Sequence, residues 1–302
     1  MHHHHPFRHY PSGSHVLAVL LALASALAFA VASVAQQRAA ATVTDDEVDR
    51  GQLIGVLIRS PRWWAGTLGN FGGYLLQAAA LAFGSLLLVQ PILVLSVLFA
   101  LPLEAHKLGK KLARSVWAWG GVLVVSLALF VTLGDTNHGA PQPTPKSWLL
   151  LAVIGLPVLG LVLLAGLRRR GAARSSLVAI VVGALAGIAA LLTKAVVEHL
   201  DRRPLDVLTH PEIYALVLVG IAGVYLQQVA FQAGALRTSM PIIQVTEPVV
   251  AAALGVILLH EHLRGGTGKL ALLGVVTVLM AVATVILARG HASFEEEAVK
   301  TG

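Results

Sequence analysis

Cysteine is absent from this chain, and only 12% of its 302 residues are charged. Without cysteine there is neither a disulfide framework nor a thiolate that could bind a metal or act as a nucleophile. A single water-soluble domain of this size cannot bury several runs of about twenty apolar residues in one core. The composition therefore excludes a soluble globular protein.

Apolar residues make up 56% of the chain, and the mean hydropathy is +0.78. Many of them lie in runs long enough to cross about 30 Å of hydrocarbon as a helix. We therefore expect an all-α integral membrane protein with about nine transmembrane helices. The expected spans are 14–36, 61–83, 86–105, 112–133, 147–168, 174–197, 212–233, 238–259 and 268–289.

Basic residues are distributed unevenly between alternate loops, and this predicts the orientation. One side has 15 of the 22 lysine and arginine residues and the other has six, with Lys194 inside a span. Because cytoplasmic loops are enriched in basic residues, we expect the C-terminus in the cytoplasm and the N-terminus outside, in the plasma (inner) membrane. Residues 1–13 would then form an extracytoplasmic histidine-rich tail, either a cloning remnant or native, and 291–302 a cytoplasmic tail. Thr44 and Glu47 fit a capping box that would begin a short interfacial helix.

A weak internal duplication relates residues 14–133 to residues 174–290. Gln77 and Pro91 match Gln227 and Pro241 at a constant offset of 150. The span 147–168 would link the two four-helix repeats, and an odd linker helix inserts the second repeat with opposite polarity. Inverted repeats of this kind are typical of secondary transporters, which bind substrate near the midplane.

Glu247 is the strongest site candidate, because a carboxyl group near the bilayer centre is costly unless it has a function or a partner. Gln244 precedes it by one turn, and Pro248 removes a backbone donor directly after it. We interpret the group as a proton or cation site beside a broken helix. The alternative is a glutamate hydrogen-bonded to a neighbouring helix.

Other polar side chains at membrane depth could line the same substrate or ion path, or could join helices by hydrogen bonds. They are Gln77, Gln227, Gln228, Asn70, Tyr74 and Gln90. Pro91 and Pro241 are expected to kink helices at equivalent points of the two repeats, and Pro248 completes the helix-breaking set.

The outer end of the sixth span carries Lys194 and Glu198 one turn apart, where a salt bridge between them is favoured over a gating role. The outer loops also contain imidazole and carboxyl groups that could concentrate divalent cations, although their spacing fits no specific metal motif. These residues are His199, Asp201, Asp206, His210, Glu212, His260, Glu261 and His262.

Residues 237–266, with Glu247-Pro248, Gly255 and Glu261, resemble the end of the EamA domain in the drug/metabolite transporter superfamily. The first repeat is similar to the nine-span, NIPA-like branch of magnesium transporters: Trp63-Trp64-Ala65-Gly66 opens a span, and AFGSLLLVQPILVLSVL follows. The resemblance implies an inverted-repeat transporter. Tyr74 stands where that branch has an acidic residue, which argues against Mg²⁺, a cation that prefers carboxylate ligands.

We therefore expect a secondary transporter or exporter of a small metabolite, coupled to protons at Glu247. The alternatives are a magnesium or other divalent-cation permease, and a non-transporting subunit for envelope assembly or lipid-carrier translocation. The loops hold no recognisable cofactor motif or catalytic constellation, so an enzyme is not expected. The expected partners are the lipid bilayer and a small molecule or ion, with a homodimer as the candidate assembly and no nucleic acid.

Overall fold

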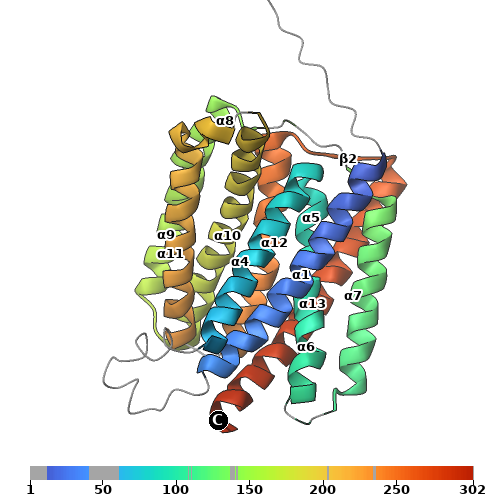
Figure 1. The fold of residues 1–302 in the computed structure, drawn as a ribbon, viewed down its shortest axis with the longest axis vertical. Coiled ribbons are helices and arrows are strands. Elements are labelled where there is room, and N and C mark those ends of the chain that lie inside the picture. Colours follow the sequence, from blue (N-terminus) through green and yellow to red (C-terminus); the bar gives the residue numbers. More distant parts are fainter. Residues whose placement is uncertain are drawn as a thin grey trace, which may run out of the picture.

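The structure is a computed structural model that describes residues 12–40, 61–107, 109, 111–136, 140, 142–202, 204–233 and 236–301. Within these residues it is a bundle of helices that lie roughly side by side (Figure 1). Their bounds are α1 Ser12–Ala40, α4 Pro61–Phe83, α5 Leu86–Leu93, α6 Leu95–Lys107, α7 Arg114–Leu133, α8 Pro145–Leu150, α9 Leu156–Leu167, α10 Gly171–Arg202, α11 Pro211–Ala233, α12 Leu236–Leu259 and α13 Thr267–Thr301.

Seven helical segments of the described chain are long and apolar enough to cross a membrane. They are 14–35, 86–106, 114–133, 145–167, 171–201, 239–259 and 267–290. Helices α4 and α11 form at the other two expected spans but are not among the seven. The chain is therefore an integral membrane protein by the length and composition of its helices, and the count of nine spans stays a prediction.

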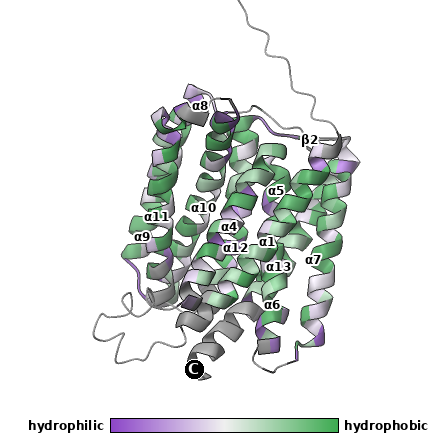
Figure 2. Ribbon diagram, viewed as in Figure 1, coloured by the Kyte–Doolittle hydropathy of each residue, from purple (hydrophilic) through white to green (hydrophobic). Residues whose placement is uncertain are grey.

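Hydrophobic residues make up most of the helices (Figure 2), and many large apolar side chains are exposed on the bundle surface. Leu161 on α9 and Leu218 on α11 are each more than 60% exposed. Contact with lipid removes the penalty that such a surface would carry in water, and helices satisfy the backbone hydrogen bonds that lipid cannot. The outer surface thus supports placement in a bilayer.

Two sets of helices pack in a similar way. α1 packs closely on α4 and then on α5 and α6, while α10 packs closely on α11 and α12. The two sets meet where α7 packs on α13 and where α5 packs on α12. A main core of buried leucine, valine and alanine side chains lies among α1, α5, α6, α7, α12 and α13.

The expected helix break beside Glu247 is not found, because α12 runs as one helix through both Pro241 and Pro248. The third span does divide, but at Val94 between α5 and α6, three residues beyond Pro91. The linker span contains a π-helical turn, Leu151–Gly155 (η1), which the sequence reading did not anticipate.

At one end of the bundle, two-residue strands β1 (Asp135–Thr136) and β2 (Leu263–Arg264) pair antiparallel. The ladder joins the chain after α7 to the chain after α12. The C-terminal end of α13 lies at the opposite end of the bundle from β2 (Figure 1), and this helix continues to Thr301, through most of the expected tail. Most of the expected N-terminal tail and the predicted interfacial helix near Thr44 fall outside the described residues.

Candidate functional site

Glu247 lies at the middle of α12, in a stretch where this helix lies close to α10. Two glycines one turn apart on α10 face it. A methyl group at Gly183 would lie 2.7 Å from the Cβ atom of Thr246, and one at Gly187 would lie 3.0 Å from the Glu247 carbonyl oxygen. Small residues allow such close approach of two membrane helices. The Gly183-x-x-x-Gly187 pair therefore fixes the backbone that carries Glu247.

The Glu247 carboxyl group has no hydrogen-bond partner among the side chains that the structure describes, and the residue is partly exposed. It lies within electrostatic reach of the Tyr74 hydroxyl group on α4. The Tyr74 ring packs edge-on against Phe29 of α1, with 4.9 Å between ring centroids. One predicted site residue of the second helix set thus lies within electrostatic reach of one from the first.

The remaining predicted path residues occupy different environments. Gln77 is buried on α4, while Asn70, Gln227 and Gln244 are partly exposed. Asn70, Tyr74 and Gln77 are spaced so that they share one face of α4. Helix α10 packs against both α4 and α11, so the helices that carry Gln77 and Gln227 share it as a neighbour. The side chain of Gln228 lies outside the described part of the chain.

Gln90 on α5 is 1% exposed, and its Nε2 atom has no hydrogen-bond partner among the described groups. A buried amide without a partner carries a desolvation penalty, so such groups are uncommon in folded proteins. Gln90 lies one residue before Pro91, close to the division between α5 and α6. No contact among the described residues joins Gln90 to Glu247, so its place on the path stays a prediction.

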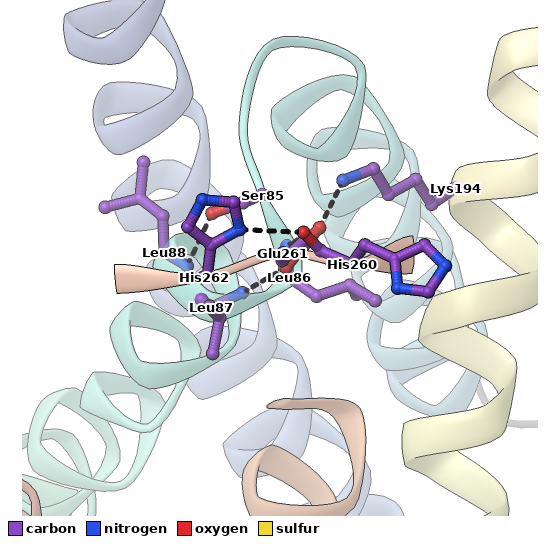
Figure 3. Close-up of polar contacts among 8 residues, drawn as sticks. All are labelled: Ser85, Leu86, Leu87, Leu88, Lys194, His260, Glu261 and His262. Carbon is purple, nitrogen blue, oxygen red and sulfur yellow. Dashed lines mark hydrogen bonds and ion pairs between the residues drawn. The ribbon is translucent and has the colours of Figure 1, made fainter. Parts of the chain in front are cut away.

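A second carboxyl group, Glu261, is fully buried just beyond the end of α12 (Figure 3). Its Oε1 atom accepts hydrogen bonds from Lys194 Nζ at 2.5 Å and from the Leu86 amide at 3.0 Å. Its Oε2 atom accepts one from the Leu87 amide at 3.1 Å. The side chain therefore caps the first turn of α5, where free amides and the helix dipole favour a negative charge.

This arrangement corrects two expectations. Lys194 forms its ion pair with Glu261, which follows α12, and not with Glu198, which lies one turn further along α10. Glu261 lies in the connection between α12 and β2 but is fully buried, so its carboxyl group does not face the solvent from which the expected loop site would collect cations. Sequence spacing along α10 contained no signal for a partner 67 residues away.

Two backbone features bring Glu261 into position. His260 adopts a left-handed conformation with φ of 55°, which ends α12, and the Glu261 amide donates to the Gly255 carbonyl oxygen at 3.0 Å. A methyl group at Gly255 would lie 2.6 Å from Glu261 Oε2. The absence of a Cβ atom at Gly255 leaves the space into which the Glu261 carboxyl group folds back over the helix.

A protein of Corynebacterium glutamicum with no assigned function is 34% identical to this chain over 277 residues, which cover 91% of the chain and 96% of the relative. The chain belongs to the same family. No family model matches the sequence, and no solved structure matches it significantly. Membership of this family brings no activity with it, so the resemblance to the drug/metabolite transporter superfamily stays a prediction.

Proposed function

We propose that this protein is a secondary transporter or exporter of a small metabolite, coupled to protons through Glu247. The observation that carries the proposal is the carboxyl group at the middle of α12, which has no hydrogen-bond partner among the described side chains. Carboxyl groups at membrane depth are rare, and they often mark proton relays in transporters. Such a group can take up a proton on one side and release it on the other.

The repetition of the helices supports an inverted-repeat transporter fold. α4 (Pro61–Phe83) and α11 (Pro211–Ala233) are offset by 150 residues at both ends, and α5 and α12 begin at the same offset. α1 and α10 run in opposite directions through the bundle (Figure 1), and each packs on the next two helical segments of its own set. In this proposal α4 and α11 also cross the bilayer, giving nine spans, with the linker 147–168 outside the symmetry.

The site also supports the proposal, because Glu247 and Tyr74 belong to different repeats. Alternating access requires contacts between the repeats that form and break as one set rocks against the other. A carboxyl group that is within electrostatic reach of the other repeat, and is not hydrogen-bonded to it, leaves the two sets free to move in this way. The EamA-like sequence around Glu247-Pro248 points to the same superfamily.

Purified protein in proteoliposomes provides the direct test, with a metabolite panel and a divalent-cation panel that includes Mg²⁺, each measured with and without a pH gradient. Glu247→Gln keeps the shape of the side chain but cannot release a proton. We expect normal insertion and loss of gradient-driven flux, while Glu198→Gln, the same change near the end of α10, keeps the flux of the parent. Full gradient-driven activity in Glu247→Gln would overturn proton coupling at this residue.

The proposed orientation places the C-terminus in the cytoplasm and the loop before α8 outside, in the plasma membrane. The ends of α6 and α9 and the starts of α7 and α10 lie at one end of the bundle (Figure 1), and these junctions carry many of the basic residues. Reporter fusions after Gly302 and within residues 134–146 should report opposite sides. The same side for both would contradict the nine-span topology.

A further inference from the structure

Three potential metal ligands meet where α10 ends and α11 begins, at the same end of the bundle as β2. His199 lies near the end of α10, and His210 follows the short 3₁₀ helix η2 (Pro204–Thr209). Glu212 is in the first turn of α11. One ligand atom from each residue lies within 4.8 Å of the others. The three residues do not form a sequence motif. They lie close together because the chain turns back through η2 between α10 and α11.

The connector that brings the ligands together is held by its own hydrogen bonds. The Tyr214 hydroxyl group donates to the Leu208 carbonyl oxygen at 2.8 Å, and the His210 amide donates to the Val207 carbonyl oxygen at 3.3 Å. These bonds fix the approach of η2 to α11. The backbone that carries His210 and Glu212 is therefore held in place without a bound ligand.

The polar groups of this cluster do not hydrogen-bond one another. His199 Nε2 lies 3.8 Å from Glu212 Oε2, too far for a hydrogen bond. Glu212 Oε2 is buried without any hydrogen-bond partner among the described groups. The His199 and His210 rings are stacked with centroids 3.6 Å apart. Imidazole nitrogens are among the commonest protein ligands of transition metals, and here two of the rings lie side by side.

We propose that His199, His210 and Glu212 bind a divalent transition-metal ion of the zinc class. Two imidazoles and one carboxylate suit Zn²⁺, Co²⁺ or Ni²⁺ far better than Mg²⁺, which prefers oxygen ligands. Bonds of about 2.0–2.2 Å to one ion require the three donors to draw closer together and the two stacked rings to turn toward the ion. The ion would also give Glu212 Oε2 the positive partner that it lacks.

Gln142, from the segment before α8, extends the site. Its Nε2 atom lies 3.3 Å from Nδ1 and 3.2 Å from Nε2 of His199. With the amide turned so that its oxygen faces the ring, Gln142 can accept a hydrogen bond from the imidazole N–H that does not bind the metal and so orient the ring. A bound ion would therefore tie α10 and α11 to the segment before α8, at the end of the bundle where Lys194 contacts Glu261.

Zinc binding to the purified full chain tests the proposal, with titration by calorimetry and Co²⁺ absorption spectra that report the ligands and their geometry. Histidine-rich tails bind these metals themselves, so the comparison uses a background in which His2 to His5 and His9 are replaced by serine. We expect one Zn²⁺ per chain. His199→Asn, His210→Asn and Glu212→Gln should each weaken Zn²⁺ binding by at least about tenfold. Tenfold is the lower limit because removing even a residue that only supports a metal ligand weakens affinity by about that much.

His262→Asn is the matched control, because this exposed histidine lies at the same end of the bundle but outside the cluster. It should bind Zn²⁺ as the background protein does. If His199→Asn fails to fold, His210→Asn and Glu212→Gln on the connector decide the matter. Absence of Zn²⁺ binding in the background protein, or unchanged affinity in the ligand variants, would overturn the site; neither result bears on Glu247.

Discussion

Glu247 lies in α12 and Glu261 lies just beyond its end, but the two carboxyl groups differ in burial and in hydrogen bonding. Glu261 is fully buried and accepts hydrogen bonds from Lys194 and from two amides of α5. Glu247 is within electrostatic reach of Tyr74 and has no hydrogen-bond partner among the described side chains. The first arrangement fixes a charge in place, and the second leaves a carboxyl group available to change its protonation or its partner.

The largest expected difference between the two groups is in stability. Glu261→Gln keeps the shape of the side chain but leaves the Lys194 ammonium group buried without a counterion. Breaking a buried pair in this way costs about 3–5 kcal/mol. We expect a corresponding loss in the free energy of unfolding, measured by chemical denaturation in detergent. The double variant Glu261→Gln, Lys194→Met should recover part of it, and no recovery would show that Lys194 is not the partner that matters.

An intermediate effect is expected where helices approach through glycine. Gly187→Ala places a methyl group 2.9 Å from the Ala251 amide nitrogen, so α10 and α12 must separate or shift. Overpacking of this kind costs about 1–3 kcal/mol. Gly220→Ala on α11 is the matched control, since nothing lies within 4 Å of its added methyl group. Equal thermal stability of the two variants would argue against the close crossing at Glu247.

A similar comparison isolates the position of Glu261. Gly255→Ala places a methyl group 2.6 Å from Glu261 Oε2, and the carboxyl group must move from its hydrogen bonds to α5. We expect a loss of about 1–3 kcal/mol in a parent background. The loss should shrink in the Glu261→Gln, Lys194→Met background, where the bonds are already weakened. Additive effects in the two backgrounds would mean that Gly255 acts independently of Glu261.

The smallest stability change is expected for Glu247→Gln. The parent carboxyl group has no ion pair to lose, so we expect a change within about 0.5 kcal/mol, as at sites away from buried networks. The same unfolding assay used for Glu261→Gln measures it. A large destabilisation would show that Glu247 braces the helices, in which case the contrast between the two glutamates would disappear.

Apolar runs were sufficient to predict where the helices form, because lipid demands a long uninterrupted helix for each crossing. The pattern also placed Glu247 correctly at the middle of its helix. It could not predict that α12 continues past Pro248, since tertiary packing on α10 compensates for a lost backbone donor. The Gly183-x-x-x-Gly187 spacing was visible in the sequence and would have predicted the close crossing.

The contacts of Glu261 were beyond sequence reasoning for a different reason. The carboxyl group meets the Leu86 amide across 175 residues, and local spacing favoured Glu198 as the partner of Lys194. His199, His210 and Glu212 were recognised as potential ligands, but only the turn through η2 shows which of the outer-loop residues share one place. Contacts between side chains that are far apart in the sequence can be identified only once the fold is known.

The contact between Glu261 and α5 also has a consequence for biogenesis. A ribosome completes α5 long before it reaches residue 261, so α5 enters the membrane with its first amides uncapped by this side chain. Long-range closure of this kind is slow, because it requires the distant segments to find each other. We expect the N-terminal half produced alone to be degraded rapidly, and co-production of the C-terminal half as a separate chain to protect it by supplying Glu261 in trans.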